Sequence, residues 1–242
     1  MKAMILAAGL GTRLKPFTNH HPKALAKVND KTLLEINIRK LQQLGINDIV
    51  VNVHHFADQI EDFLIKNDHF GSNIIISDER NQVLETGGGL KKAIPLLSNS
   101  EDILVMNVDI LSDINLEQLI NHHKRSGAIA TLAVQNRNSS RAFLFADEDL
   151  EKRLIGWQNN NTKEQKIPCP NKNEWTTLAF SGIQILKSTF LSKIKQEGKF
   201  SLVDVYLSLC CEEKIFGYNH TGDKLLDVGK PESLEIAKQM FA

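Results

Sequence analysis

The amino-acid sequence predicts a three-layer α/β/α fold, in which a mostly parallel central sheet is covered by helices on both faces. Short apolar runs of strand length alternate with longer segments of helical periodicity through the first half of the chain. These short runs are apolar almost throughout, which is typical of strands that are buried on both faces. A chain of 242 residues is long enough to bury such a core as a single domain.

The elements expected in the first half follow this alternation. Strands are predicted at Lys2–Ala8, Asp48–Val53, Asn73–Ser77, Ile103–Asn107 and Ala128–Val134. Helices are predicted at Lys31–Leu44, Ala57–Ile65, Thr86–Leu97 and Leu116–Lys124. A helix between two successive strands is the order that makes the strands parallel neighbours.

The second half of the chain has a weaker pattern and begins with a polar stretch, Gln135–Trp175, that is rich in Asn and Lys. We expect a flexible loop around Asn159–Lys172 within it. The strands predicted in this half are Arg141–Phe145, Arg153–Trp157, Leu178–Leu186 and Leu225–Val228, and the helices are Ser188–Gln196, Leu202–Cys210 and Pro231–Met240. The last helix carries a proline in its first turn, where a missing N–H costs nothing.

Composition argues against several classes of protein. Lys plus Arg and Asp plus Glu each number 29, so no general attraction to nucleic acid or to an anionic membrane is expected. The sequence contains no run of about 18 apolar residues, so no membrane span is expected. The three cysteines, of which Cys210 and Cys211 are adjacent, include no CxxC pair. We therefore expect neither a disulfide framework nor a zinc site, and a reducing cytosol fits best.

The strongest motif extends from Leu6 to Thr18 and is followed by Pro22-Lys23-Ala24-Leu25. Small residues leave the first strand, and Gly9 and Gly11 permit close approach of the backbone. Consecutive N–H groups can then point into one concavity that suits the oxygens of a polyphosphate. Arg13, Lys15 and Lys23 bring positive charge to the same loop.

Two better-known phosphate loops do not fit this segment. A dinucleotide-binding fingerprint needs a third glycine where Leu14 stands, and the GxxxxGK[ST] pattern of a P-loop is absent. Gly9-Leu10-Gly11 alone would indicate only an ordinary glycine turn. The full string, with Thr12-Arg13, Pro16, Thr18 and the Pro-Lys pair, is much more specific.

With these residues the chain resembles the family of nucleotidyltransferases that make nucleotide sugars, whose signature is L-A-A-G-x-G-T-R-[L/M]-x-P-x-T followed by P-K-x-L. The likeness is greatest to the branch that contains N-acetylmuramate 1-phosphate uridylyltransferase, with mannose-1-phosphate guanylyltransferases next. It implies a Rossmann-like nucleotidyltransferase fold in one domain, residues 1–242. Residues 1–134 would then form the nucleotide-binding part, and residues 135–242 a smaller sugar-phosphate-binding part with the C-terminal helices.

The resemblance also implies roles for particular residues. Arg13 and Lys23 correspond to catalytic cations, and Asp109 and Asp227 to ligands of Mg²⁺. The implied nucleotide-binding residues are Leu6, Ala7, Ala8, Gly9, Gly11, Thr12, Glu85, Thr86, Gly87 and Gly88. The implied sugar-phosphate-binding residues are Asn107, Ser181 and Gly182. Many relatives have glycine before the first metal-binding aspartate, whereas Val108 stands here.

The positions of these residues in the predicted fold support the same roles. Asp109 follows an apolar strand and should lie at the carboxyl edge of the sheet, where open α/β sheets bind ligands. The alternative for Asp109 is a cap on the next helix, and the alternative for Asp227 is a simple turn before Gly229. The glycines that follow Thr86 suggest close approach of the backbone to a ligand at a helix start.

The resemblance implies an enzyme that condenses a nucleoside triphosphate, with UTP or GTP favoured, and a sugar 1-phosphate. The products would be a nucleotide sugar and pyrophosphate, with Mg²⁺ as the cofactor. We expect a cytoplasmic monomer or homodimer with no nucleic-acid or membrane partner.

Three alternatives remain open. One is a cytidylyltransferase that acts on an alcohol phosphate such as phosphocholine. Another is a catalytically inactive nucleotide-binding regulatory subunit, which the presence of Arg13, Lys23, Asp109 and Asp227 together disfavours. A glycosyltransferase fits less well, because no Asp-x-Asp motif surrounds Asp109.

Overall fold

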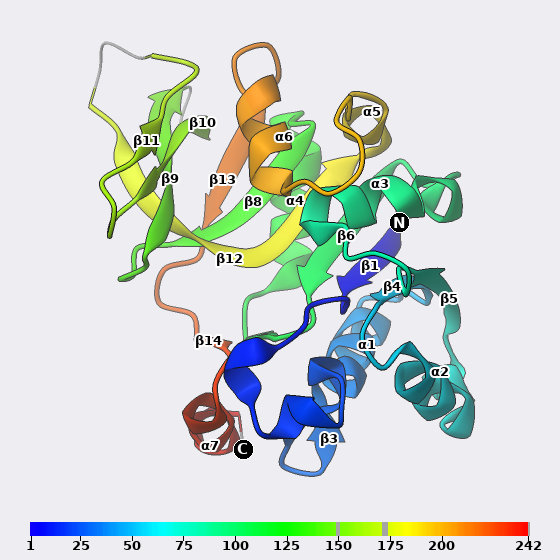
Figure 1. The fold of residues 1–242 in the computed structure, drawn as a ribbon. Helices are drawn as coiled ribbons and strands as arrows, with labels where there is room; N and C mark the ends of the chain where they lie inside the picture. The colour runs from blue at the N-terminus through cyan, green and yellow to red at the C-terminus, as the bar shows by residue number, and fades with distance from the viewer. Residues whose placement is uncertain (149–150, 171–173, 242) are drawn as a thin grey trace.

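The computed structural model describes residues 1–148, 151–170 and 174–241. Its central feature is a ten-stranded sheet with helices against both faces (Figure 1). The sheet contains β1 (Lys2–Leu6), β4 (Asp48–Val53), β5 (Asn73–Asp78), β6 (Asp102–Asn107), β8 (Ala130–Gln135), β9 (Arg141–Glu148), β10 (Glu151–Asn159), β11 (Gln165–Lys166), β12 (Thr176–Lys187) and β13 (Ile215–Asn219). Two short two-stranded sheets pair β2 (Lys27–Val28) with β3 (Lys31–Thr32) and β7 (Ile110–Ser112) with β14 (Leu225–Asp227).

The helices divide between the two faces of the sheet. One core contains residues of α1 (Leu33–Gln43), α2 (Ala57–Lys66), α4 (Leu116–Ser126) and α7 (Pro231–Met240). The other core contains residues of α3 (Glu85–Leu97), α5 (Ser188–Ser192) and α6 (Leu202–Leu209). This arrangement confirms the predicted α/β class with helices on both faces of a central sheet. No helix in the described part of the chain is long and apolar enough to span a membrane.

The sheet is parallel in its first half and mixed in its second. The order β5-β4-β1-β6 is parallel, and Ile5 of β1 lies opposite both Val51 and Met106. The long strand β12 then runs antiparallel between β6 and β8, with Ile183 opposite Met106. The sheet is therefore mixed rather than mostly parallel, because the chain returns through β12 and the β9–β10 hairpin instead of through further helices.

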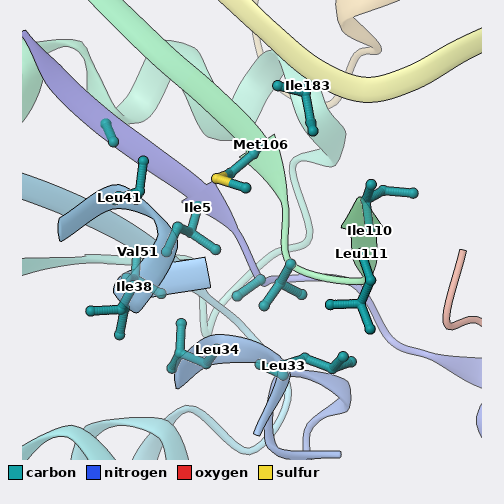
Figure 2. Packing of buried hydrophobic residues seen from close by; sticks show 14 of the residues in the cluster. Ile5, Leu33, Leu34, Ile38, Leu41, Val51, Met106, Ile110, Leu111 and Ile183 are labelled. Carbon is teal, nitrogen blue, oxygen red and sulfur yellow. The ribbon is translucent and has the colours of Figure 1, made fainter. Parts of the chain in front are cut away.

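Helix α1 illustrates how the sequence produces this packing. The Thr32 side chain accepts a hydrogen bond from the Glu35 N–H at 3.1 Å and so caps the start of the helix. Leu34, Ile38 and Leu41 of the helix lie against the underside of the sheet (Figure 2). Each is fully buried, and replacement of one such side chain by alanine costs about 2–5 kcal/mol.

The polar second half contains more strand than the sequence predicts. Strand β10 extends to Asn159, and the following turn leads into β11, which pairs with β10. The predicted loop around Asn159–Lys172 is therefore partly ordered as a hairpin; its last residues, Asn171 and Lys172, lie outside the described residues. Strand β13 is absent from the sequence prediction because its run is short and contains Gly217.

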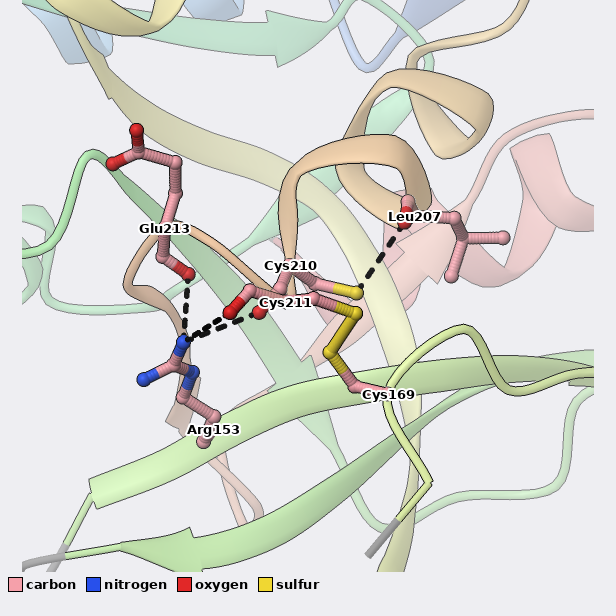
Figure 3. Close-up of a disulfide and its surroundings, with 6 residues drawn as sticks. All are labelled: Arg153, Cys169, Leu207, Cys210, Cys211 and Glu213. Carbon is pink, nitrogen blue, oxygen red and sulfur yellow. Dashed lines mark hydrogen bonds between the residues drawn. A yellow bond between two sulfur atoms is a disulfide. The ribbon is translucent and has the colours of Figure 1, made fainter.

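Cys169 and Cys211 form a disulfide across a sequence separation of 42, which shows that the expectation of no disulfide was wrong (Figure 3). The fold brings the segment after β11 against the end of α6, a contact that cysteine spacing does not reveal. The buried Cys210 remains a free thiol. Arg153 of β10 donates hydrogen bonds to the carbonyl oxygens of Cys210 and Glu213 and holds the same turn in place.

Candidate active site

A cavity of about 330 Å³ opens at the carboxyl ends of β1 and β6. The predicted residues that line it are Leu6, Ala7, Ala8, Gly9, Gly11, Thr12, Arg13, Lys23, Glu85, Thr86, Asn107 and Asp109. The cavity also has four lining residues that the sequence did not single out as ligand-binding: Asn52, Val83, Val108 and Gly229. The signature loop, the start of α3 and the end of β6 therefore converge on one space.

The loop after β1 turns at Gly11, whose φ of 61° lies in the left-handed region that favours glycine. The Thr18 hydroxyl donates a hydrogen bond to the Gly11 carbonyl oxygen at 2.9 Å. A Cβ at position 11 would lie 2.9 Å from the Thr18 methyl carbon and 3.1 Å from the Lys23 Cβ. Both the backbone angle and the lack of space require glycine here, and the turn brings Lys23 to the loop.

A buried chain of hydrogen bonds links the signature loop to the loop before α3. The backbone N–H groups of Ala7 and Ala8 donate to Asn52 Oδ1 at 2.7 and 3.3 Å. Asn52 Nδ2 donates to Glu79 Oε1 at 2.7 Å, and the Leu84 N–H donates to Glu79 Oε2 at 3.3 Å. Burial of the Glu79 carboxyl raises its pKa, and the hydrogen bond from Asn52 opposes that shift.

The three glycines at the start of α3 serve packing within the protein. The Gly87 N–H donates to the Phe200 carbonyl oxygen, and a Cβ on Gly87 would lie 2.4 Å from the Phe200 ring. A Cβ on Gly88 would lie 2.2 Å from the Gly198 carbonyl oxygen. Gly87 and Gly88 are not among the cavity residues, so the structure places close protein neighbours where the sequence suggested a ligand.

Lys23, Asp109 and Asp227 form the charged centre of the site. The buried Lys23 ammonium makes an ion pair with Asp109, and its Nζ lies 3.9 Å from Asp227 Oδ1. Arg13 Nη2 lies 3.4 Å from the other oxygen of Asp227. Antiparallel pairing of β7 with β14 brings the two aspartates together, because Asp227 lies opposite Ile110 and the Val228 N–H donates to the Asp109 carbonyl oxygen at 2.8 Å.

The two carboxylates suit a small divalent cation. Mg²⁺ is usually bound by one or two protein carboxylates together with substrate phosphates. The position of Lys23 between Asp109 and Asp227 shows that both carboxylates face a space already occupied by positive charge. The Asp227 side chain is 47% exposed, which leaves oxygen available to an incoming ion.

The residues assigned to the sugar phosphate have different surroundings. Asn107 lines the cavity, whereas Ser181 is fully buried and its hydroxyl lies 2.7 Å from His220 Nε2. The β12–β8 register shifts around Gly182, which has a φ of 71°. A Cβ on Gly182 would lie 3.0 Å from Asn107 Nδ2, so this glycine gives the Asn107 amide its space.

Comparisons with known proteins identify the family of this chain. A model of the family described as nucleotidyl transferase matches residues 2–242. N-acetylmuramate alpha-1-phosphate uridylyltransferase of Caulobacter vibrioides is 31% identical, with 99% of this chain and 96% of that protein covered. The enzyme of the same name from Neisseria meningitidis serogroup B is 33% identical, with 99% and 98% covered.

The fold is also found in solved structures. A putative glucose-1-phosphate thymidylyltransferase from Bacillus anthracis, in complex with sucrose, superposes with a TM-score of 0.81 at 18% identity. The alignment covers 99% of this chain and 94% of that chain. The family model and the two relatives together define a nucleotidyl-transferring enzyme. The chain belongs to the nucleotidyl transferase family, as its signature loop predicts.

Proposed function

We propose that the protein condenses a nucleoside triphosphate with a sugar 1-phosphate and releases pyrophosphate. An oxygen of the sugar phosphate attacks the α-phosphorus in line, forming a new P–O bond as the bond from the α-phosphorus to the pyrophosphate oxygen breaks. The observation that supports this most is the convergence of Arg13, Lys23 and Asp109 on one cavity, with Asp227 within ion-pair distance of both cations.

Positioning and charge neutralisation dominate reactions of this type, and no covalent nucleophile is required. Arg13 is exposed at the mouth of the signature loop, where it stabilises the negative charge of the departing pyrophosphate. The Lys23 side chain is buried in the same site, where it orients the α-phosphate and balances developing charge. The backbone N–H groups of Gly9 and Gly11 approach the remaining phosphate oxygens.

Asp109 and Asp227 would hold Mg²⁺ in this proposal. A bound magnesium ion neutralises phosphate charge and orients the attacking and α-phosphate groups. Lys23 offsets the repulsion between the two carboxylates before substrate arrives, because its ammonium lies between them. Asn107, with its amide beside Gly182, is placed to bind the sugar phosphate.

The substrates proposed first are UTP and N-acetylmuramate 1-phosphate, since the two relatives quoted above carry that name over nearly their whole length. GTP with mannose 1-phosphate comes next. We propose that the enzyme is cytoplasmic and acts as a monomer or homodimer. In this proposal the stretch Gln135–Ile183 determines which sugar is bound. The loop before α3 determines which nucleobase is bound.

Pyrophosphate release tests the proposal. Each of the four ribonucleoside triphosphates is combined with phosphocholine and with N-acetylmuramate, mannose, glucose and heptose 1-phosphates, in Mg²⁺ and in a chelator. We expect release with at least one pair and only with metal. Release with CTP and phosphocholine alone would favour an alcohol-phosphate cytidylyltransferase. Nucleotide binding without release from any pair would favour a regulatory subunit.

A further inference from the structure

A second hollow, of about 570 Å³, lies in the part of the chain assigned to the sugar. It is an open groove between the segment that joins β8 to β9 and the turn that follows β10. Its lining consists of Arg137, Asn138, Ser139, Ser140, Asn160 and Asn161. Amide and hydroxyl groups both donate and accept hydrogen bonds, as the hydroxyls of a sugar ring require.

Arg137 is the cation of this groove, and its side chain reaches strand β12. Its Nη2 donates a hydrogen bond to the Phe180 carbonyl oxygen at 2.9 Å. Phe180 directly precedes the turn of β12 at Ser181 and Gly182, and Gly182 adjoins the Asn107 amide in the first cavity. Arg137 therefore stands between the polar groove and the residues that line the nucleotide cavity.

The charge of Arg137 lacks the close partner that the other two cations have. Arg13 is paired with Asp227 and Lys23 with Asp109, whereas no carboxylate in the described part of the chain lies within ion-pair distance of Arg137. Removal from water lowers the pKa of Arg137, and the Asp227 carboxylate acts in the opposite direction. The guanidinium is therefore attracted by the Asp227 carboxylate but forms no ion pair with it.

We propose that Arg137 binds the phosphate of the sugar 1-phosphate, with the sugar ring in the groove beside it. A planar guanidinium offers two parallel N–H donors to a phosphate. The hydrogen bond from Arg137 Nη2 to the Phe180 carbonyl oxygen already orients this group. A phosphate held there would lie beside Phe180, which directly precedes the turn that adjoins the Asn107 amide. This inference rests on the proposed function and adds a specificity-determining cation to it.

The test uses the full chain with the substrate pair that gives the fastest pyrophosphate release. Arg137→Gln should raise KM for the sugar 1-phosphate about 10- to 100-fold, since a hydrogen-bonded charged contact is lost. KM for the nucleoside triphosphate and the melting temperature should stay close to wild type. Arg137→Lys should recover part of the loss, because it restores charge without the paired donors.

Arg125→Gln is the matched control, since it removes one exposed positive charge from α4, away from both hollows. It should behave as wild type. An active wild type with an unchanged sugar-phosphate KM in Arg137→Gln would overturn this inference and leave the proposed function standing. A parallel rise in both KM values together with a lowered melting temperature would also overturn it, because that result indicates a structural role for Arg137. A wild type silent with every pair would overturn the proposed function and this inference together.

Discussion

The Lys23 ammonium is ion-paired with the Asp109 carboxylate in the cavity at the carboxyl ends of β1 and β6, and only 7% of Lys23 is exposed. A buried charge with its partner removed is strongly destabilising, so each residue depends on the other. The pair also shows that the site is electrostatically balanced before any substrate binds. In the proposed reaction, substrate phosphates and a metal ion would therefore redistribute charges that already neutralise one another.

Replacement of Lys23 by methionine should make the protein respond more strongly to Mg²⁺. Without the ammonium, Asp109 and Asp227 repel each other until a cation binds. We expect a larger rise in melting temperature on addition of Mg²⁺ than in wild type, and turnover reduced about 10²- to 10³-fold. Differential scanning fluorimetry measures the first effect, and Lys23→Met/Asp109→Asn, which should lose the enlarged response, is its control.

Glu79→Gln tests the buried link between Asn52 and Leu84. The folded-state pKa of Glu79 is raised above its unfolded value, so ionisation opposes folding. Its neutral form contributes stability below the unfolded pKa, and this contribution is lost as pH rises through the folded pKa. Wild type should therefore lose stability relative to Glu79→Gln between about pH 4 and about pH 8. Urea unfolding at both values measures the difference, and a pH-independent difference would contradict the assignment.

Gly182→Ala should disturb Asn107 without reaching the signature loop. The φ of 71° costs a non-glycine residue about 1–2 kcal/mol, and the new Cβ would lie 2.7 Å from Ile110 Cγ1. We expect a lowered melting temperature and a raised KM for the sugar 1-phosphate, with KM for the nucleoside triphosphate nearly unchanged. Gly127→Ala, which also has positive φ but open space around it, separates backbone strain from the contact with Ile110.

The Cys169–Cys211 disulfide leaves Cys210 as the single free thiol among the three cysteines. Protein unfolded without reductant should therefore react with one equivalent of a thiol reagent, and reduced protein with three. Cys169→Ser should lower the free energy of unfolding by about 3–5 kcal/mol in the chain-entropy description of a cross-link of this length. Three reactive thiols before reduction would contradict the cross-link.

The sequence predicts the first half of this fold well because each signal there is local. Apolar runs such as Ile103–Met106 place Asp109 at the sheet edge, and the signature string places Gly11 and Lys23. The second half depends on long-range pairing, which a single sequence does not encode locally. The reversed strand β12, the short β13 and the contact of Cys169 with Cys211 all belong to that class.

Part of the candidate site also lay beyond sequence reasoning. Asn52 stands out only as a polar residue inside the apolar run Ile49–Val53, and its partners Ala7 and Glu79 are distant in sequence. The sequence predicts a ligand contact for the glycines after Thr86, whereas Phe200 and Gly198 occupy the space beside Gly87 and Gly88. In both cases the deciding contact comes from a remote segment.

The most direct test of the central claim is pyrophosphate release by wild type, Asp109→Asn and Asp227→Asn, in Mg²⁺ and in a chelator, with Arg125→Gln as the control. The proposed site predicts metal-dependent release by wild type and by the control. Each aspartate variant should lose about 10²-fold or more in rate while it remains folded by circular dichroism. Full activity of folded Asp109→Asn in Mg²⁺, or release by wild type that is indifferent to the chelator, would contradict a reaction centred on the two aspartates.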